Sequence, residues 1–150
     1  MSAGAVRKVA GYIVDCLPDE FVQGQPFGVN IAGNGIYTLA KDGISQQDID
    51  QFMCAVGVEL TNRGIHISSV RSGGQTGIDE AGAAMGKVLE VPPAVHAPKD
   101  WLFRGEDGKD VASQEAFKNR FASKDYGKLA STARAMMTPK IARRSTIKMA

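Results

Sequence analysis

The chain has 150 residues, 43% of them hydrophobic and 23% charged, and a net charge of +2 at pH 7. This size and composition predict a single globular domain with a hydrophobic core. They exclude a membrane-spanning protein, because no apolar run is long enough to cross a bilayer. The first residues carry no secretory pattern, and the two cysteines make neither a disulfide framework nor a metal motif. We therefore expect a cytoplasmic protein with no metal and no membrane partner.

Residues 1–28 are predicted to be an N-terminal extension of the domain. Its apolar run from Val6 to Leu17 fits either an added strand or a short helix, because its periodicity does not decide between them. A nucleotide-binding core is assigned to residues 29–122. Its first strand covers residues 27–32 and ends in Gly33-Asn34-Gly35, which is typical of a turn.

A helix is predicted to begin at Ser45, which forms a capping box with Asp48. Its apolar residues keep helical spacing on one face, and Gly64 ends it in a left-handed conformation. These apolar residues are Ile49, Phe52, Met53, Val56 and Leu60.

Two further strands and a helix complete the predicted core. Residues 65–71 form the second strand, residues 78–89 the second helix and residues 94–97 the third strand. Residues 98–110 are polar and predict a loop, and residues 114–121 and 124–137 predict two more helices. This alternation predicts an α/β fold: a single small Rossmann-like domain with a mainly parallel sheet flanked by helices.

The segment Ser72-Gly73-Gly74-Gln75-Thr76-Gly77 joins the second strand to the second helix. Glycines let a backbone approach a ligand closely, and the first amides of a helix favour an anion such as phosphate. We therefore predict that all six residues bind a phosphate-bearing ligand. The same glycines would also suit a tight turn, and the Ser72 and Thr76 hydroxyls would also suit helix capping.

Other candidate site residues lie after the strands or in the first turn of the second helix. Carboxylates at Asp79 and Glu80 would repel a phosphate but suit ribose hydroxyls or general acid–base catalysis, so Asp79 is a candidate ligand contact and Glu80 a candidate catalytic residue. Both carboxylates would equally complement the helix dipole without any function. In parallel sheets the loops after the strands meet at one edge. Four further residues are therefore predicted to contact the ligand: Gly33, Asn34, Lys99 and Arg104.

Residues 72–79 read Ser-Gly-Gly-Gln-Thr-Gly-Ile-Asp, which resembles the glycine signature of the SLOG superfamily of Rossmann-like proteins. The likeness is to its molybdenum-cofactor carrier branch, supported by Ala97-Pro98-Lys99 and by residues 104–108. The loop is also similar to that of the DNA-processing protein A family, which binds single-stranded DNA. It resembles less closely the loop of the Lonely Guy phosphoribohydrolases, in which Glu80 would fall on the catalytic glutamate.

The residues and the resemblance together predict that the chain binds a nucleotide or a nucleotide-derived small molecule. No other cofactor is assigned. One alternative is a nucleotide N-glycosidic hydrolase, so the question of enzyme activity stays open. Another is a nucleic-acid-binding or assembly protein that uses residues 123–150 as a basic helical tail. Because this tail also carries apolar residues, such as Leu129 and Ile141, we expect it to pack on the domain or on a partner, in a homo-oligomer or a larger assembly.

Overall fold

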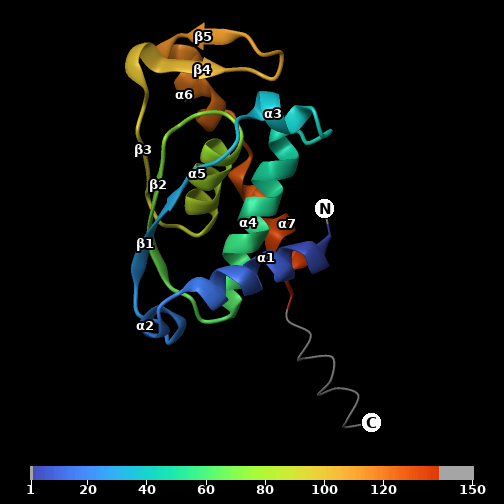
Figure 1. The fold of residues 1–150 in the computed structure, drawn as a ribbon, viewed down its shortest axis with the longest axis vertical. Helices are drawn as coiled ribbons and strands as arrows, with labels where there is room; N and C mark the ends of the chain where they lie inside the picture. The colour runs from blue at the N-terminus through green and yellow to red at the C-terminus, as the bar shows by residue number, and fades with distance from the viewer. Residues whose placement is uncertain (1, 139–150) are drawn as a thin grey trace.

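A computed structural model describes residues 2–138 and is shown in Figure 1. Helices and strands alternate along the chain, and a small hairpin follows the third strand. The elements are α1 (Ala3–Cys16), α2 (Asp19–Val22), β1 (Phe27–Ile31), α3 (Ile36–Ala40), α4 (Gln46–Asn62), β2 (Ile67–Ser72), α5 (Ile78–Val88), β3 (Pro93–Val95), the 3-10 helix η1 (Lys99–Trp101), β4 (Leu102–Arg104), β5 (Asp110–Ala112), α6 (Gln114–Ala122) and α7 (Tyr126–Met136).

The three core strands form one parallel sheet in the order β1-β2-β3. At its carboxyl end, Ile31 of β1 pairs with Ser72 of β2, and Ser72 pairs with Val95 of β3. The chain therefore leaves all three strands at the same edge of the sheet. The predicted α/β class with a mainly parallel sheet is confirmed.

Helix α4 begins and ends as its sequence predicts. The Ser45 hydroxyl accepts a hydrogen bond from the Asp48 amide at 3.0 Å, and the Asp48 carboxylate accepts one from the Ser45 amide at 3.0 Å. This capping box satisfies amides that have no partner within the helix. Gly64 follows the helix with a φ of +83°, a conformation that L-residues with side chains rarely adopt.

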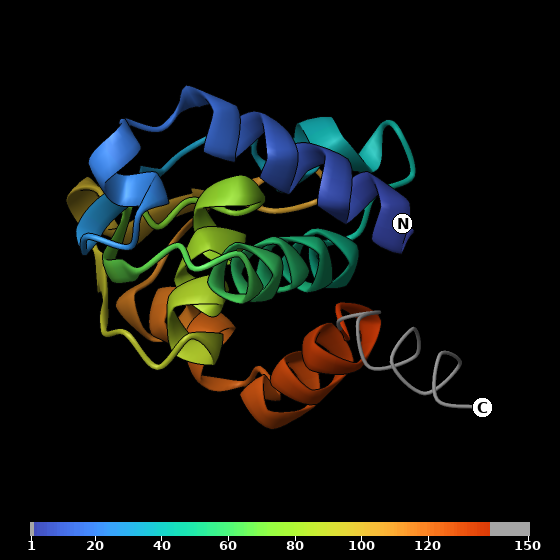
Figure 2. The same ribbon diagram turned by 90° about the horizontal axis from the view of Figure 1, so that it is seen from below.

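The hydrophobic core is built around α4 and α5. Helix α5 packs on the sheet, and α4 packs on α5 between α1 and α7 (Figure 2). Small residues let these elements approach closely. A Cβ on Gly57 of α4 would lie 2.6 Å from Cγ of Met85, and one on Gly82 would lie 2.7 Å from the Ile31 side chain. Helix α7 buries Leu129 and Ala133 in the same core, so the first part of the predicted tail packs on the domain.

The opposite face of the sheet is exposed in the described residues. Gly28 and Asn30 of β1, Arg71 of β2 and Ala94 of β3 are exposed, whereas Val70 of β2 is buried. Parallel sheets usually carry helices on both faces. This sheet has its helices on one face, so its strands alternate between buried or half-buried and exposed residues.

Several local predictions were wrong or incomplete. Residues 3–16 form a helix, so the alternative of an added N-terminal strand is wrong. The short helices α2 and α3 were not predicted. Residues 98–110 are not a plain loop, because they contain η1, β4 and the start of β5, and Phe103 pairs with Val111 in an antiparallel hairpin. Helices α6 and α7 were predicted almost to the residue.

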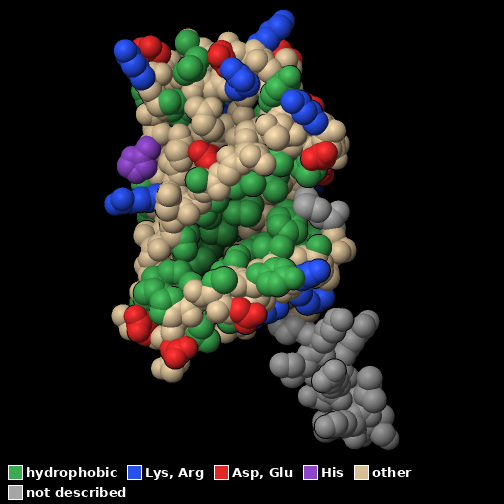
Figure 3. Space-filling model, in the orientation of Figure 1, with side chains coloured by type: hydrophobic (Ala, Val, Ile, Leu, Met, Phe, Trp, Pro, Cys, Tyr) green, Lys and Arg blue, Asp and Glu red, His purple; other side chains and the backbone are tan. Residues whose placement is uncertain are grey.

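One face of the molecule carries an apolar hollow (Figure 3). Half-buried hydrophobic residues of β1, α1 and α4 pack at the margin of the core, among them Val29, Ile13 and Phe52. β1 is an edge strand and pairs with β2 alone within residues 2–138.

Within residues 2–138 no helix is both long enough and apolar enough to cross a bilayer.

Candidate ligand-binding site

The glycine loop lies at the carboxyl edge of the sheet, between the segments that follow β1 and β3. His96, directly after β3, donates its amide hydrogen to the Ser72 carbonyl at 2.9 Å. On the other side, the Ile78 amide donates to the Asn34 carbonyl at 3.1 Å. The fold thus brings Gly33, Asn34 and the glycine loop together, as the order of strands and loops predicted.

Part of this edge is open to solvent. Gly33, Asn34 and Gly73 are exposed, and Asp79 lies below them with 7% of its surface accessible. The Gly33 amide donates to Oδ1 of Asp79 at 3.2 Å. A Cβ on Gly73 would lie 2.7 Å from Oδ2 of the same carboxylate. The absence of a side chain at Gly73 therefore leaves the second oxygen of Asp79 next to the open backbone of the loop.

Polar groups of the loop itself lack partners. The Gly73 amide continues the ladder between β2 and β1, where Ser72 pairs with Ile31. Among residues 2–138, the amides of Gly74, Gln75 and Thr76 donate to no protein acceptor. Ser72 is 1% exposed, and its hydroxyl oxygen also has no hydrogen-bond partner among these residues. Buried polar groups in proteins are almost always hydrogen-bonded. A buried hydroxyl and neighbouring amides without acceptors are what an anion-binding loop supplies.

The remainder of the loop is committed to internal contacts. The Thr76 hydroxyl donates to the Arg104 carbonyl at 2.7 Å and accepts from the Ile36 amide at 3.2 Å. The Gly77 amide donates to Oε1 of Gln46 at 2.6 Å, and Gln75 Nε2 donates to the Leu102 carbonyl at 2.9 Å. These bonds tie the loop to α3, to α4 and to the β4–β5 hairpin.

Two of the glycines are required by packing and backbone conformation. Gly74 has a φ of +76°, and a Cβ there would lie 2.7 Å from the Phe117 ring. Gly77 has a φ of +84°, and a Cβ there would overlap the backbone of Asn34 and Gly35. The lack of a side chain at these two positions serves the fold, whether or not a ligand binds. Gly73 does not have a left-handed φ, and the close neighbour of a Cβ there would be the end of the Asp79 side chain.

The side chain of Glu80 lies in a buried network of charges and is 3% exposed. Its Oε1 pairs with Nε of Arg120 at 2.7 Å, and its Oε2 pairs with Nζ of Lys124 at 2.7 Å. Lys124 also pairs with Oδ2 of Asp50 at 2.6 Å. Both oxygens of Glu80 are engaged, so this geometry favours a structural role. Its catalytic role stays a prediction.

Arg120 links this network to the glycine loop. Its Nη2 donates to the Gly74 carbonyl at 2.7 Å, and its guanidinium carbon lies 4.3 Å from the centre of the Phe103 ring. Its Nη1 is buried without a hydrogen-bond partner in the described residues. Sequence reasoning missed Arg120, Lys124 and Asp50. The only signal was Asp50 itself, an acid next to the apolar stripe of α4.

The network shifts the pKa values of its members. Burial lowers the pKa of Lys124, but the nearby Glu80 and Asp50 carboxylates outweigh it, so the pKa lies above 10.5. Burial raises the pKa of Asp50, and the negative charge of Glu80 adds to this, whereas Lys124 and Gln46 oppose it. Burial, with a smaller contribution from Asp50, raises the pKa of the nearby Cys54 thiol to about 12.

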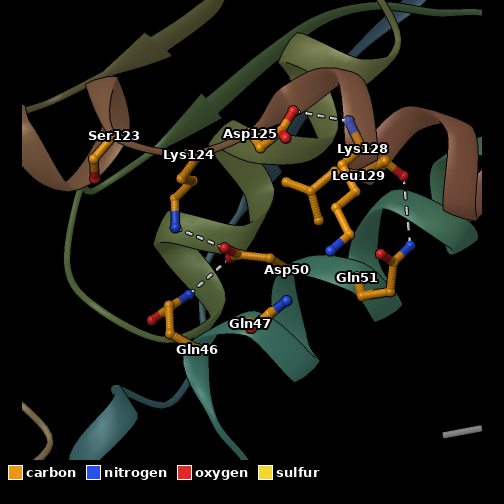
Figure 4. A pocket seen from close by; sticks show the side chains of 9 residues that line it. All are labelled: Gln46, Gln47, Asp50, Gln51, Ser123, Lys124, Asp125, Lys128 and Leu129. Carbon is orange, nitrogen blue, oxygen red and sulfur yellow. Dashed lines mark hydrogen bonds and ion pairs between the residues drawn. The ribbon is translucent and has the colours of Figure 1, made fainter.

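A polar pocket of about 320 Å³ opens beside Asp50 and Lys124 (Figure 4). It lies between α4 and the segment that joins α6 to α7. Figure 4 shows Gln46 and Lys124 both directed at the Asp50 carboxylate. Because this carboxylate is already paired on both oxygens, the pocket offers a ligand mainly glutamine amides and Lys128.

The two predicted cations of the site, Lys99 and Arg104, both lie in the segment that follows β3. The Arg104 guanidinium pairs with the Asp110 carboxylate at 2.9 Å within the hairpin. This pairing keeps the pKa of Arg104 above its usual value and that of Asp110 below it. Lys99 is exposed in η1. In residues 2–138 no group of three or more His, Cys, Asp or Glu side chains is placed to hold a metal ion.

Comparisons with protein-family models, with curated proteins and with solved structures give no match to this chain. The geometry described above is therefore the basis for any assignment of function.

Proposed function

We propose that the chain binds a phosphate-bearing, nucleotide-type small molecule at the exposed part of the glycine loop. The phosphate accepts hydrogen bonds from the Gly74, Gln75 and Thr76 amides beside the open backbone of Gly73, and a sugar hydroxyl donates to the free oxygen of Asp79. The observation that carries this proposal is the set of unpartnered amides above a carboxylate of which only one oxygen has a hydrogen-bond partner. Amides alone would suit any anion, whereas the carboxylate favours a ligand with a hydroxyl near its phosphate.

The charge of Asp79 makes the proposal testable. The carboxylate repels a bare phosphate but accepts a hydrogen bond from ribose. Asp79→Asn keeps an oxygen for the Gly33 amide and removes the charge. We expect it to weaken binding of adenosine monophosphate by about tenfold or more, because a hydrogen bond to a charged group contributes about 1.5–3 kcal/mol. Inorganic phosphate should bind equally well or better.

The experiment is isothermal titration calorimetry with both compounds. Gly73→Ala adds a methyl group beside Asp79 and should weaken adenosine monophosphate binding, while the exposed Gly127→Ala and Asp15→Asn serve as matched controls. If Asp79→Asn and Gly73→Ala both bound adenosine monophosphate with wild-type affinity, the ligand would not bind at this site. Gly74→Val, an obvious choice from sequence, would disturb packing on Phe117 and test folding instead.

A Rossmann-like fold and membership of the SLOG superfamily are part of this proposal, supported by the sequence of residues 72–79 and by the parallel sheet. The hydrolase alternative requires Glu80 to leave Arg120 and Lys124 when substrate binds. The nucleic-acid alternative uses the cations of residues 123–150. Lys128 and Arg134 are exposed on α7, and the cations of residues 139–150 lie outside the described residues. Absence of base release from common nucleotides, and of salt-dependent binding to single-stranded DNA, would remove these alternatives.

We also propose self-association, through the β1 edge. β1 carries no charged residue, and unprotected edge strands readily pair with another chain. The apolar hollow in Figure 3 lies on the face of the molecule that displays this edge in Figure 1. Light scattering should give the mass of a dimer, and Val29→Lys should return the mass of a monomer. A wild-type monomer at high concentration would contradict this proposal.

A further inference from the structure

A second hollow, of about 500 Å³, lies beside β3 between α5, α6 and α7. It is separate from the exposed glycine loop, because none of residues 72–77 lines it. Its walls are mostly apolar, and four of the lining residues are aromatic: Trp101, Phe117, Phe121 and Tyr126. Hollows of this size and apolar character are typical of sites for small molecules.

The charged residues that line this hollow are both positive. Its two charged lining residues within the described chain are Lys87 of α5 and Lys118 of α6, and both are exposed. Lys118 Nζ lies 5.3 Å from the centre of the Trp101 ring, and Lys87 Nζ lies 6.0 Å from that of Tyr126. Each ammonium group therefore stands over one aromatic wall, with no carboxylate in the lining to neutralise it.

The backbone around Trp101 is unusual. Asp100 and Trp101 have φ values of +60° and +57°, a region that residues with side chains rarely adopt. The Trp101 ring meets the Phe117 ring edge to face, with centroids 5.4 Å apart and an interplanar angle of 65°. Strained backbone of this kind is found disproportionately at binding sites. Here it holds the indole on the wall of the hollow.

We propose that this hollow binds a planar aromatic anion of one or two rings. The rings insert between the aromatic walls, and the anionic group lies between Lys87 and Lys118. An aromatic wall favours a flat apolar ligand, and two unneutralised cations at the rim favour a negative charge. This site is independent of the function proposed for the glycine loop.

The probe is 2-naphthoate, with neutral 2-naphthamide as its matched comparison, measured by calorimetry. We expect the anion to bind at least tenfold more tightly than the amide. The double variant Lys87→Glu/Lys118→Glu should lose at least tenfold in affinity for 2-naphthoate, while the control Lys8→Glu/Lys41→Glu changes it less than twofold. Absence of binding at millimolar 2-naphthoate, equal affinity for both probes, or equal loss in the control would overturn the proposal.

A second readout does not depend on charge. Trp101 is the single tryptophan of the chain, so its indole gives one N–H resonance that should shift on addition of 2-naphthoate. Ala97→Phe, at an exposed position of the lining, should block binding, and Asp79→Asn should leave it unchanged. The site would be contradicted if Ala97→Phe bound 2-naphthoate with wild-type affinity and the Trp101 indole resonance did not shift during the titration. The site would also be contradicted if the protein formed a dimer whose interface covers the hollow and which binds no 2-naphthoate.

Discussion

The two halves of the glycine loop are used differently. Around Gly73 the backbone is exposed, amides lack acceptors, and Asp79 keeps one oxygen next to open space. Around Gly74 and Gly77 the backbone is buried, and neighbouring polar groups bond to Arg120, Gln46 and the hairpin. Neighbouring residues of one motif therefore have separate roles. The glycine packing and the side-chain bonds of the loop fix the fold, whereas the amides of Gly74 to Thr76 and one oxygen of Asp79 are left free to bind a ligand.

The largest effect should come from the charged network of the buried half. Glu80→Ala leaves Arg120 and Lys124 buried without their shared partner. Removal of one member of a buried ion pair costs about 3–5 kcal/mol, so we expect a loss of that size in the free energy of unfolding, measured with urea. Glu106→Ala, an exposed acid in the hairpin turn, is the control. Loss of less than about 1 kcal/mol in Glu80→Ala would show that the network does not stabilise the fold.

Substitution of a glycine should destabilise the fold more in the buried half of the loop than in the exposed half. Gly77→Ala forces a side chain into a left-handed backbone against Asn34 and Gly35, which should cost about 2–5 kcal/mol. Gly73→Ala meets only the end of the Asp79 side chain and should cost about 1 kcal/mol or less. Thermal unfolding of both variants checks the difference. Equal loss in the two would mean that the whole loop serves packing.

The raised pKa of Lys124 predicts a pH dependence of stability. Its pKa lies above 10.5 in the folded chain, so its contribution is fully present below pH 10.5 and is lost as the pH rises through the folded value. The stability difference between wild type and Lys124→Gln should therefore shrink from pH 9 to pH 12, by at most about 1.4 kcal/mol per pH unit. Lys128→Gln, at an exposed lysine four residues further on, is the control. If the stability difference between wild type and Lys124→Gln grew with pH, the pKa of Lys124 would not be raised by folding.

The alkylation rates of the two cysteines should report small local opening of the core around the charged network. Cys16 is exposed, whereas Cys54 is fully buried and its pKa is raised to about 12. Because the thiolate is the reactive form, iodoacetamide at pH 8 should modify Cys16 and spare Cys54, as mass spectrometry would show. In Glu80→Ala the rate at Cys54 should rise. Equal rates in the wild-type chain would mean that this part of the core opens readily.

Sequence patterns were sufficient for the main elements of the fold. The capping box at Ser45, the apolar stripe of α4 and the glycine loop each depend on neighbours within a few residues, so the sequence displays them directly. The helix over residues 3–16 was undecided because its apolar residues fit two periodicities. The hairpin was missed because its strands are three residues long and lie in a polar segment, where pattern is weakest.

The site was predictable in part for the same reason. Strand ends and glycines, both visible in the sequence, were enough to bring Gly33, Gly73 and Asp79 to one edge of the sheet. The partners of Glu80 were not predictable, because Arg120 and Lys124 lie 40 and 44 residues away and meet it only in the folded chain. Charge alone suggested that Arg104 would face the loop, whereas Asp110, six residues on, is its partner.

The most direct test of ligand binding at the exposed half is a titration of ¹⁵N-labelled protein with adenosine monophosphate, followed by nuclear magnetic resonance. Our account predicts that the amide resonances of Gly73, Gln75 and Gly33 shift together with one dissociation constant, and that these shifts disappear in Gly73→Ala. Shifts confined to other parts of the chain, or no shifts at millimolar ligand, would contradict it.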